Sequence, residues 1–409
     1  MEKKTKNGLP AEIRYCVKCN LINQRTTGKN EFFHTPETIH KTVKFDENGV
    51  CAGCHFVKKE FDEKVINWEE REKELKELCD ANRKNNGEHD CIVPGSGGKD
   101  SVYAAYILKH KYKMNPLTVT WSPHLYTDVG WKNFQSWLHK GGFDNYLYTP
   151  NPKIHKLVTR EAVLRLLHPF QPFIIGQKMF ATKIAAKFNI PLIFYGEMQG
   201  KGGKEVSHKA KTFAESGNQG GFEMDPLEGK KFEDAYLGGK QIKEYLDEGI
   251  TLNDLESYRP LNIETAKKKK INFYYLGYFL RWIPQEMYYF AVKNTDFSPN
   301  PQRTEGTYTK YQSLDDKIDG FFHYTSYIKF GFGRAMSDSC EEVRHGHITK
   351  DEGKALIKKF DGEYPQRYEN EFYDYISMKK EEFLELCDKF RPDHIWQKKS
   401  NQWILKKSL

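Results

Sequence analysis

Residues 91–110, "CIVPGSGGKDSVYAAYILKH", place a Ser-Gly-Gly-Lys-Asp-Ser loop between an apolar run and an amphipathic pattern. This order predicts a strand, a glycine-rich turn and a helix. Glycines let the backbone approach an anion closely, and the start of the following helix presents free N–H groups. Ser96 and Ser101 add hydroxyl donors, and Lys99 adds a positive charge. The loop therefore predicts a phosphate-binding site.

Two common phosphate-binding motifs do not fit this loop. A Walker A loop requires G-x-x-x-x-G-K-[ST], but Lys99 is followed by Asp100 and position 93 is Val. The dinucleotide fingerprint G-x-G-x-x-G, started at Gly95, ends on Asp100. The order S-G-G-x-D-S instead resembles the PP-loop ATP pyrophosphatases, which cleave ATP to AMP and pyrophosphate. The resemblance implies that Lys99 and Asp100 are catalytic within an ATP site formed by Ser96, Gly97, Gly98, Lys99, Asp100 and Ser101.

Two further carboxylates are candidates for this site. Asp100 either orients the loop or helps to hold Mg²⁺ on the departing pyrophosphate, and a glycine turn without a ligand is the alternative for the loop as a whole. A later strand, in "LIFYGEMQG" (192–200), ends at Gly196 and Glu197. The ends of parallel strands meet at one edge of a sheet, so we expect both residues at the ATP site. Glu197 binds Mg²⁺, orients substrate or remains a solvated loop carboxylate.

The segment "KFGFGRAMSD" (329–338) carries charged groups between glycines, ahead of a helical pattern. We expect Lys329 to neutralise developing phosphate charge as a catalytic residue. Arg334 suits a bidentate clamp on a carboxylate or phosphate, and we expect it to act in catalysis and, with Asp338, in substrate binding. A glycine turn with surface charges is the alternative.

Two C-x-x-C pairs, "CVKC" and "CAGC", lie 31 residues apart near the N-terminus. Each pair places two thiolates on one tight turn, and two facing turns form the tetrahedral sulfur site that Zn²⁺ favours. Unconnected thiols, a redox dithiol and an iron–sulfur cluster are the alternatives. The sequence therefore predicts a structural zinc ion bound by Cys16, Cys19, Cys51 and Cys54.

Composition excludes some classes of protein. The chain has 409 residues and a formal net charge of +8, from 64 basic and 56 acidic residues. This modest excess suits nucleotides, acidic sugars or RNA without choosing among them. There is no apolar signal-like segment at the start and no apolar run of about 18 residues. We therefore expect a cytoplasmic protein that does not associate with membranes.

Strand-like and helix-like patterns alternate between about residues 90 and 195, which predicts a doubly wound parallel α/β sheet. The expected strands are 91–93, 117–121, 146–149 and 192–195, and the helices between them are 99–112, 128–140, 152–167 and 173–188. Outside this unit we expect a helix at 60–86, a polar helical stretch at 223–258, a buried strand leading into a helix at 271–282, and helices at 314–330, 335–345, 350–360 and 379–390.

These elements suggest four parts, in a fold of the PP-loop (HUP-like Rossmannoid) type. They are a zinc-ribbon-like segment at 1–60, a linking helix at 61–88, an ATP-binding domain at 89–290 with a mobile loop at 196–222, and a mostly helical substrate or partner region at 291–409.

Long C-terminal strings carry a narrower resemblance. Together with the cysteine pairs and "PGSGGKDS", they are "YYLGYFLRWIPQEMYYFAV", "RTEGTYTKYQSLDDKIDGFFHYTSYIKFGFGRAMSD" and "RHGHITKDEGKALIKKFDGEYP". The chain resembles the N-acetyl sugar amidotransferases, the WbpG and PseA type enzymes of lipopolysaccharide and nonulosonic acid synthesis. The resemblance implies that an acetamido sugar is converted to an acetamidino sugar: the amide oxygen attacks ATP, pyrophosphate leaves, and ammonia then displaces AMP.

The ammonia must come from another protein. No cysteine lies in a G-x-C-x-G nucleophile elbow of a glutaminase. The resemblance therefore implies a separate glutaminase subunit similar to HisH, acting with a HisF-like subunit.

Two other functions compete with this one. A tRNA-modifying PP-loop enzyme, of thiolase or lysidine synthetase type, also combines an ATP loop with zinc and basic charge. A thiolase commonly uses a cysteine pair near its site, whereas the cysteines outside the N-terminal pairs are isolated here, so nucleic acid is not the expected partner. A nucleotide-binding regulatory module without turnover would leave Lys99, Asp100, Lys329 and Arg334 unused.

Overall fold

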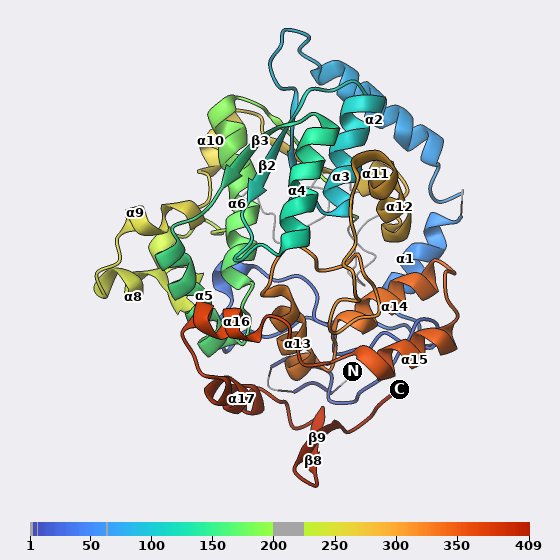
Figure 1. Cartoon of the computed structure of the whole chain (residues 1–409), viewed down its shortest axis with the longest axis vertical. Helices are drawn as coiled ribbons and strands as arrows, with labels where there is room; N and C mark the ends of the chain where they lie inside the picture. The colour runs from blue at the N-terminus through green and yellow to red at the C-terminus, as the bar shows by residue number, and fades with distance from the viewer. Residues whose placement is uncertain (1–2, 6, 63, 199–224) are drawn as a thin grey trace.

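The structure, a computed structural model, describes residues 3–5, 7–62, 64–198 and 225–409. Five parallel strands, of which β2 and β3 are labelled in Figure 1, form the central sheet in the order β3-β2-β1-β4-β7. The chain extends from β1 toward β3 and then returns to place β4 on the other side of β1, so the strand order reverses between β1 and β4. This confirms the predicted doubly wound parallel sheet. The strands are β1 (Cys91–Pro94), β2 (Pro116–Trp121), β3 (Asp144–Tyr148), β4 (Leu192–Tyr195) and β7 (Asn272–Tyr275).

Helices cover both faces of the sheet. On one face α6 (Gln171–Phe188) contacts β2 and β4, and on the other α3 (Lys99–Tyr106) contacts β1 and β4. Both α4 (Asp128–Gly141) and α12 (Pro284–Thr295) pack against α3. The other α-helices are α1 (Ala52–Glu60), α2 (Trp68–Asn82), α5 (Pro152–Leu166), α8 (Ile242–Asp247), α9 (Leu252–Leu255), α10 (Ile263–Lys268), α11 (Leu276–Phe279), α13 (Asp319–Phe330), α14 (Arg334–Arg344), α15 (Lys350–Phe360), α16 (Glu369–Ile376) and α17 (Lys380–Lys389).

Short elements complete the described part of the chain. There are 3₁₀ turns η1 (Glu31–Phe33), η3 (Phe232–Asp234) and η4 (Glu256–Tyr258), a π-helical turn η2 (Ile107–Lys111) that prolongs α3, and two antiparallel hairpins formed by β5 (Tyr236–Leu237) with β6 (Lys240–Gln241) and by β8 (Trp396–Lys399) with β9 (Gln402–Leu405).

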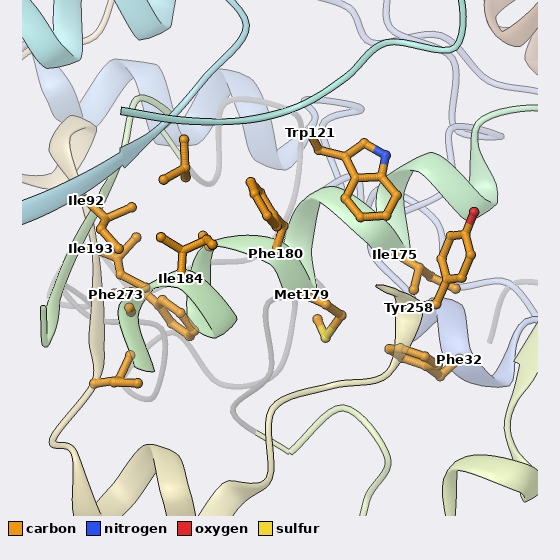
Figure 2. Close-up of a cluster of buried hydrophobic side chains, with 14 of the residues drawn as sticks. Phe32, Ile92, Trp121, Ile175, Met179, Phe180, Ile184, Ile193, Tyr258 and Phe273 are labelled. Atoms are coloured by element: carbon orange, nitrogen blue, oxygen red, sulfur yellow. The ribbon is translucent and has the colours of Figure 1, made fainter. Parts of the chain in front are cut away.

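Side chains of the central strands alternate between two cores. Ile92 and Ile193 point into the core beneath α6, whereas Val93 and Phe194 point into the core beneath α3 and α4. A strand places successive side chains on opposite faces, so a sheet covered on both faces needs apolar residues at every position. Figure 2 shows the α6 side chains, among them Phe180, pointing toward those of the strands.

The four predicted strands are confirmed, with small shifts at their ends. The helix expected at 60–86 is confirmed as α2, but over a shorter range. Residue 60 ends a separate helix, α1, and α2 begins only at Trp68. The side chain of Asn67 accepts a hydrogen bond from the Glu70 backbone N–H at 3.2 Å and so caps the second helix. The polar stretch 223–258 also contains only short helices, separated by the β5–β6 hairpin, in its described part.

The helix expected at 314–330 begins later, at Asp319. Asp316 ends the preceding loop, because its carboxylate accepts a hydrogen bond from the Ile318 backbone N–H at 2.9 Å. An Asp side chain that bonds backbone two residues on favours a turn over a helix. The helices expected at 335–345, 350–360 and 379–390 are confirmed as α14, α15 and α17, and α12, α16 and the β8–β9 hairpin complete the C-terminal region.

The N-terminal cysteine segment shares a core with the C-terminal region. Cys19 and Ile22 are buried in one cluster with Met336 from α14 and with Ile395 and Trp396 near the C-terminus. In Figure 1 the N-terminal segment likewise lies among the C-terminal helices. The Tyr15 hydroxyl donates to the Lys407 carbonyl at 2.8 Å. The N-terminal segment therefore packs against the C-terminal region. The expected domain boundaries at residues 60, 88 and 290 stay predictions.

The expected mobile loop at 196–222 lies outside the described residues from residue 199 onward. Within the described residues, no helix is both long enough and apolar enough to cross a bilayer.

Two phenylalanines of α6 test the assignment of its buried face. Phe180 is 6% exposed and Phe188 is 43% exposed. We expect Phe180→Ala to lower the free energy of unfolding by about 3–5 kcal/mol, because the change leaves a cavity beneath the sheet. Phe188→Ala is the matched control and should cost much less. Chemical denaturation measures both, and equal losses would contradict this packing.

Candidate active site

The loop after β1 is shaped by its glycines. Gly97 has φ +85°, and a Cβ there would lie 2.6 Å from the Cα of Phe134, in α4. Only glycine fits such a position. Gly98 precedes the first residue of α3 as its N-cap, and the Ser101 hydroxyl donates to the Gly98 carbonyl at 2.9 Å. The loop thus lies at the N-terminus of α3, where backbone N–H groups and the helix dipole favour an anion.

The end of β4 closes against this loop. A Cβ on Gly196 would lie 2.9 Å from the carbonyl oxygen of Asp100 and 3.0 Å from the Cβ of Ala104, so the strand end and the first turn of α3 touch. This contact is at the point where the strand order reverses between β1 and β4. Doubly wound sheets bind ligands at the carboxyl ends of the strands beside such a point.

A cavity of about 310 Å³ opens at this position. Its polar side includes Ser96, Asp100 and Glu197 together with Asp315, Asp316 and Asp319, and another side is largely apolar. The apolar wall is formed by Val119, Trp121, Phe170, Phe173, Phe180 and Tyr195. A cavity with one apolar wall and one wall of loop donors suits a nucleotide, whose base is flat and apolar and whose phosphates are charged.

A second cavity of about 280 Å³ adjoins the first across the loop. Gly97, Lys99, Gln312 and Arg334 line it. Both cavities are lined by Ser96, Gly98, Asp100, Asp315 and Asp319. The loop therefore has a space on each side, which two reactants could occupy next to the same phosphate-binding groups.

Lys99 and Asp100 are held in place by one another. The ammonium of Lys99 donates to Asp100 Oδ2 at 2.6 Å and to Gln312 Oε1 at 3.3 Å. The indole N–H of Trp282 donates to Asp100 Oδ1 at 3.2 Å. Lys99 is buried and Asp100 is partly buried, so the carboxylate balances the charge of the lysine. Gln312 and Trp282 were not expected at the site from the sequence.

Two acidic residues that the sequence analysis missed face both cavities. Burial raises the pKa of Asp315 to about 6, although a hydrogen bond with Ser96 opposes this. Burial also raises the pKa of Asp319, against the opposing charge of Arg334. The signal was present in "SLDDKID" (313–319), where three acidic residues precede a helix, but the same pattern is typical of a solvated helix start. Carboxylates of this kind are the ligands that Mg²⁺ prefers.

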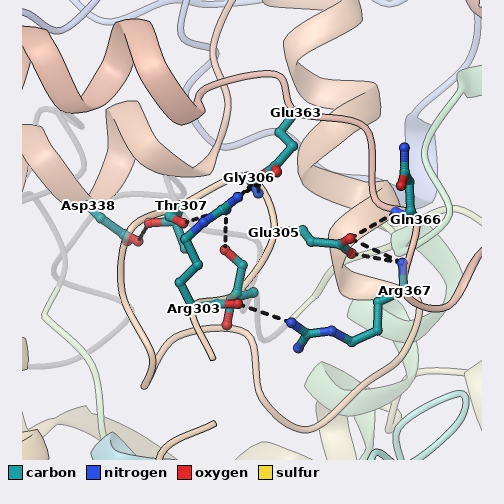
Figure 3. Close-up of polar contacts among 9 residues, drawn as sticks. Arg303, Glu305, Gly306, Thr307, Asp338, Glu363, Gln366 and Arg367 are labelled. Atoms are coloured by element: carbon teal, nitrogen blue, oxygen red, sulfur yellow. Dashed lines mark hydrogen bonds and ion pairs between the residues drawn. The ribbon is translucent and has the colours of Figure 1, made fainter. Parts of the chain in front are cut away.

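Arg334 lies at the first position of α14 and lines the second cavity. The Arg334 Nε is 3.0 Å from Asp338 Oδ1. Burial lowers the pKa of Arg334, but the charges of Asp338 and Asp319 outweigh burial and raise that pKa above its usual value. Asp338 also accepts from the Thr307 hydroxyl at 2.7 Å. A bidentate pair of 2.6 Å hydrogen bonds from Arg303 to Glu363 braces the loop that carries Thr307 (Figure 3). The structure thus brings Arg334 to the loop, with Asp338 positioned behind it.

Lys329 is placed elsewhere. Its Nζ donates to the Leu166 carbonyl at 2.9 Å, and the residue lines neither of the two cavities beside the loop. The expectation that it neutralises phosphate charge there is therefore corrected. It lies near the end of α13, about 15 Å along the helix from Asp319 at a rise of 1.5 Å per residue. Gly196 and Glu197, in contrast, line the first cavity as expected.

The four N-terminal cysteines converge on one point. The sulfurs of Cys16 and Cys54 are 3.8 Å apart, those of Cys19 and Cys51 are 3.6 Å apart, and all four lie within 4.8 Å of one another. Metal–sulfur bonds of about 2.3 Å place tetrahedral ligands about 3.8 Å apart. The Arg344 guanidinium donates to Cys19 at 3.4 Å and to Cys51 at 3.5 Å, which favours thiolates. The cluster is therefore compatible with one tetrahedral metal ion.

Comparison with curated proteins gives a short match. An uncharacterised protein of Methanocaldococcus jannaschii is 37% identical over 86 residues. The match covers 21% of this chain and 29% of that protein, so the chain spans less than a third of the relative it matches.

Comparison with solved structures gives matches at low identity and with TM-scores below 0.5. NH3-dependent NAD synthetase from Campylobacter jejuni, in complex with nitrate, is 14% identical with a TM-score of 0.26, covering 32% of this chain and 57% of its own. NMN synthetase from Francisella tularensis is 12% identical with a TM-score of 0.25, covering 50% and 96%. U34-tRNA thiolase NcsA from Methanococcus maripaludis, with its [4Fe-4S] cluster, is 14% identical with a TM-score of 0.29, covering 72% and 82%. Identities this low carry no information on substrate.

The C-terminal quarter of the chain has a family assignment of its own. Residues 305–409 match the family described as "LPS biosynthesis protein WbpG-like, C-terminal domain". This range contains Asp315, Asp319, Arg334 and Asp338. Residues 305–409 are therefore similar to the WbpG-like C-terminal domain family, which confirms the resemblance to WbpG-type proteins for the part of the chain that supplies the charged wall of the site.

Proposed function

We propose that the chain is an ATP-dependent amidotransferase that converts an acetamido group of a bacterial surface sugar to an acetamidino group. The observation that carries the proposal is the arrangement around the loop. A nucleotide-sized cavity and a second polar cavity adjoin across the same phosphate-binding backbone, and the WbpG-like region lines both. An AMP-forming enzyme needs this arrangement, because it must hold ATP and an acceptor on either side of one phosphorus.

The reaction divides between the two cavities. Adenosine lies against the apolar wall of the first, and the triphosphate tail lies along the N–H groups of the loop and the hydroxyl of Ser96. The amide oxygen of the sugar, held in the second cavity by Arg334, attacks the α-phosphorus, and the bond to pyrophosphate breaks. Ammonia then adds to the amide carbon, whose oxygen now carries the adenylyl group, and the added nitrogen loses a proton. AMP leaves with the former amide oxygen. Adenylation is needed because an amide oxygen is otherwise a poor leaving group.

The fixed charges of the site suit this sequence of steps. Lys99 lies beside the loop, where it offsets negative charge that develops on the departing pyrophosphate. The contacts of Asp100 with Lys99 and Trp282 favour an orienting role for this carboxylate over a role in binding metal. Asp315 and Asp319, with Glu197 across the first cavity, would hold Mg²⁺. A bound Mg²⁺ would supply further stabilisation of charge on the phosphates.

The cysteine positions disfavour the thiolase alternative. Cys79, Cys91, Cys340 and Cys387 are all buried, and no cysteine lines either cavity beside the loop. Sulfur transfer through a protein cysteine would need one there. Ammonia remains the proposed nucleophile, supplied by a HisH-like glutaminase with a HisF-like subunit.

Loop substitutions test the placement of ATP. We expect Ser96→Ala and Asp100→Ala each to reduce AMP formation by about 10²-fold or more, since each removes a group that binds or orients the phosphate loop. Asp247→Ala, at an exposed position at the end of α8, is the matched control and should stay within about twofold. AMP is measured by chromatography with circular dichroism as a check on folding. Full activity in either loop variant would place ATP elsewhere.

Product mass tests the reaction itself. A panel of acetamido sugars incubated with ATP, Mg²⁺ and ammonium should give a product lighter by about 1 Da, because oxygen is replaced by NH. Mass spectrometry with ¹⁵N-ammonium should add a further ~1 Da to the same product. AMP release without a change in the mass of any sugar would contradict the amidotransferase assignment.

We also propose that the metal at the cysteine cluster is Zn²⁺ and that its role is structural, because the cluster shares a core with Met336 and Trp396. Purified protein should contain one zinc per chain by elemental analysis. Cys51→Ser should lose the metal and lower the melting temperature, whereas Cys79→Ser, at a buried cysteine outside the cluster, should retain it. Iron and inorganic sulfide in place of zinc, or a melting curve that chelators do not change, would overturn the assignment.

A further inference from the structure

Helix α14 contacts both the cysteine cluster and the second cavity. Arg334, at its start, lines the second cavity, and Asp338, one turn later, forms an ion pair with Arg334. Met336 and Cys340 are instead buried in the core that contains three of the four metal-site cysteines. Residues two positions apart lie on nearly opposite sides of an α-helix, so α14 presents one face to the cavity and another to the cysteines. Figure 1 shows α14 beside α1, whose first turn carries Cys54.

The last residue of α14 donates to the cysteine sulfurs. Nη2 of Arg344 is 3.4 Å from Cys19 Sγ and 3.5 Å from Cys51 Sγ, so one nitrogen bridges two sulfurs. Arg344 is 325 and 293 positions away from these cysteines, so only the tertiary fold brings them together. Cys16 instead accepts from nearby backbone, namely the N–H groups of Lys18 at 3.4 Å and of Cys51 at 3.3 Å. Arg344 therefore links the cysteine cluster directly to α14.

The glycine of the C-A-G-C motif makes room for this guanidinium. A Cβ at Gly53 would lie 2.8 Å from Cζ of Arg344 and 2.9 Å from its Nη1. Gly53 lies inside α1, and its φ is not in the left-handed region that would by itself require glycine. A helix interior otherwise favours alanine over glycine. The guanidinium of Arg344 is therefore the feature that accounts for glycine at this position.

The charge of Arg344 suits a metal site built from cysteines. Cysteines that bind a metal are thiolates, and four of them outnumber the charge of a divalent cation. The site therefore keeps a net negative charge, which is costly to bury unless a positive group lies beside it. The guanidinium supplies that charge, and its N–H groups draw electron density from the sulfurs of Cys19 and Cys51. Groups that hydrogen-bond to metal ligands in this way tune metal affinity.

The start of α14 is held at a separate point. The Asp361 carboxylate accepts hydrogen bonds from the backbone N–H groups of Gly333 and Met336, each at 3.0 Å. Arg344 holds the other end, about 15 Å away along the helix axis at a rise of 1.5 Å per residue. Two held ends define the direction of a helix, and this direction determines where the side chain of Arg334 lies.

We propose that Arg344 is a positioning residue that couples the cysteine metal site to the active site. Its guanidinium binds the metal-ligating sulfurs of Cys19 and Cys51, and it thereby fixes the helix from which Arg334 extends into the second cavity. The proposal rests on the proposed function for the metal and for the ligand of that cavity, but most of its tests need no turnover. It gives the cysteine site a part in placing the substrate as well as in stabilising the fold.

Zinc affinity tests the contact with the sulfurs. Arg344→Met should weaken zinc binding by about 10–100-fold, as expected when a group that bonds a metal ligand is removed. Arg344→Lys keeps the positive charge without the planar guanidinium, so it should recover part of the affinity. Lys358→Met, at an exposed position on α15, is the matched control and should bind zinc as wild type does. Competition with a chelator measures all four proteins, and equal affinities would overturn the assignment.

Gly53→Ala tests the same contact from the other side. The added methyl group should displace the guanidinium and weaken zinc binding, although every cysteine remains. In the Arg344→Met background the same change should have no further effect, because Met lacks the Cζ and Nη atoms that the methyl group would meet. An equal loss in both backgrounds would show that the glycine serves the cysteine turn alone, and would contradict the contact.

A cobalt spectrum gives a readout that a merely structural role of Arg344 would not change. Protein produced with Co²⁺ in place of zinc should show a sulfur-to-cobalt charge-transfer band. Hydrogen bonds to sulfur lower its electron density, so their loss in Arg344→Met should move this band to lower energy. The band should stay at the wild-type position in Lys358→Met. An unchanged band in Arg344→Met would contradict direct contact with the bound thiolates.

Hydrogen exchange tests the coupling to α14. In zinc-loaded protein, the amides of residues 334–344 should exchange about tenfold faster in Arg344→Met than in wild type, which corresponds to the loss of one charge-assisted contact. Removal of zinc from wild type should give a similar increase, while the amides of α6 should exchange equally in both proteins. Equal exchange across residues 334–344 would overturn the coupling.

Kinetics separate this inference from the proposed function. Arg344→Met should raise the KM for the acetamido sugar roughly fivefold and leave the KM for ATP within about twofold, because Arg334 holds the sugar whereas the loop holds ATP. An equal rise in both KM values would contradict the link to Arg334. If no acetamido sugar reacts, the zinc, cobalt and exchange results still stand, and if those results fail, the proposed reaction still stands.

Discussion

Close contact between backbone segments at the end of β1 is the constraint on which the site depends. Gly97 lies against α4 and Gly196 lies against α3, with no room for a Cβ at either position. These contacts bring the ends of β1 and β4 and the start of α3 to one point, so that backbone N–H groups gather there without side chains in the way. The sheet order explains why this happens between β1 and β4, since the crossovers diverge only there.

The sheet supplies the backbone of the site, and the C-terminal region supplies most of its charge. Asp315, Asp319 and Arg334 all come from residues 305–409, whereas the loop comes from the first strand and helix of the sheet. Asp315 and Asp319 are partly buried carboxylates, and burial raises the pKa of both. A cation beside them would offset the cost of burying their charged forms, so the acidic wall and the phosphate loop suit the proposed ligand, which carries both metal and phosphate.

The parts of the fold that the sequence predicts well are those set by local pattern. Strands β1 and β4 are apolar at every position because both faces are covered, whereas β2 carries Thr118 and Thr120 and the edge strand β3 begins with Asp144 and Asn145. The Ser-Gly-Gly-Lys-Asp-Ser loop is likewise set by a short local pattern. The spacing of the four cysteines alone likewise predicts that they form one metal site. The sequence says much less about which distant residues meet in three dimensions. The expected helix at 314–330 included Asp315, because no local pattern shows that the Asp316 side chain ends the loop by bonding the Ile318 N–H. Trp282 contacts Asp100 although the two residues are 182 positions apart in the sequence.

Lys329 shows why a charged segment near glycines is a weak guide to position. Residues 329–338 were expected to act as one functional unit, but Phe330 ends α13 and Arg334 begins α14. The two basic residues of this segment, Lys329 and Arg334, therefore belong to different helices. Gly331, with φ +60°, turns the chain between them. Arg334 therefore faces Asp319 at the start of α13, while Lys329 faces Lys29 and His168 at the other end of the same helix. The two ends of one helix thus meet different surroundings, because carboxylates and Arg334 gather beside the phosphate loop whereas lysine, histidine and Glu31 side chains gather beside the N-terminal segment.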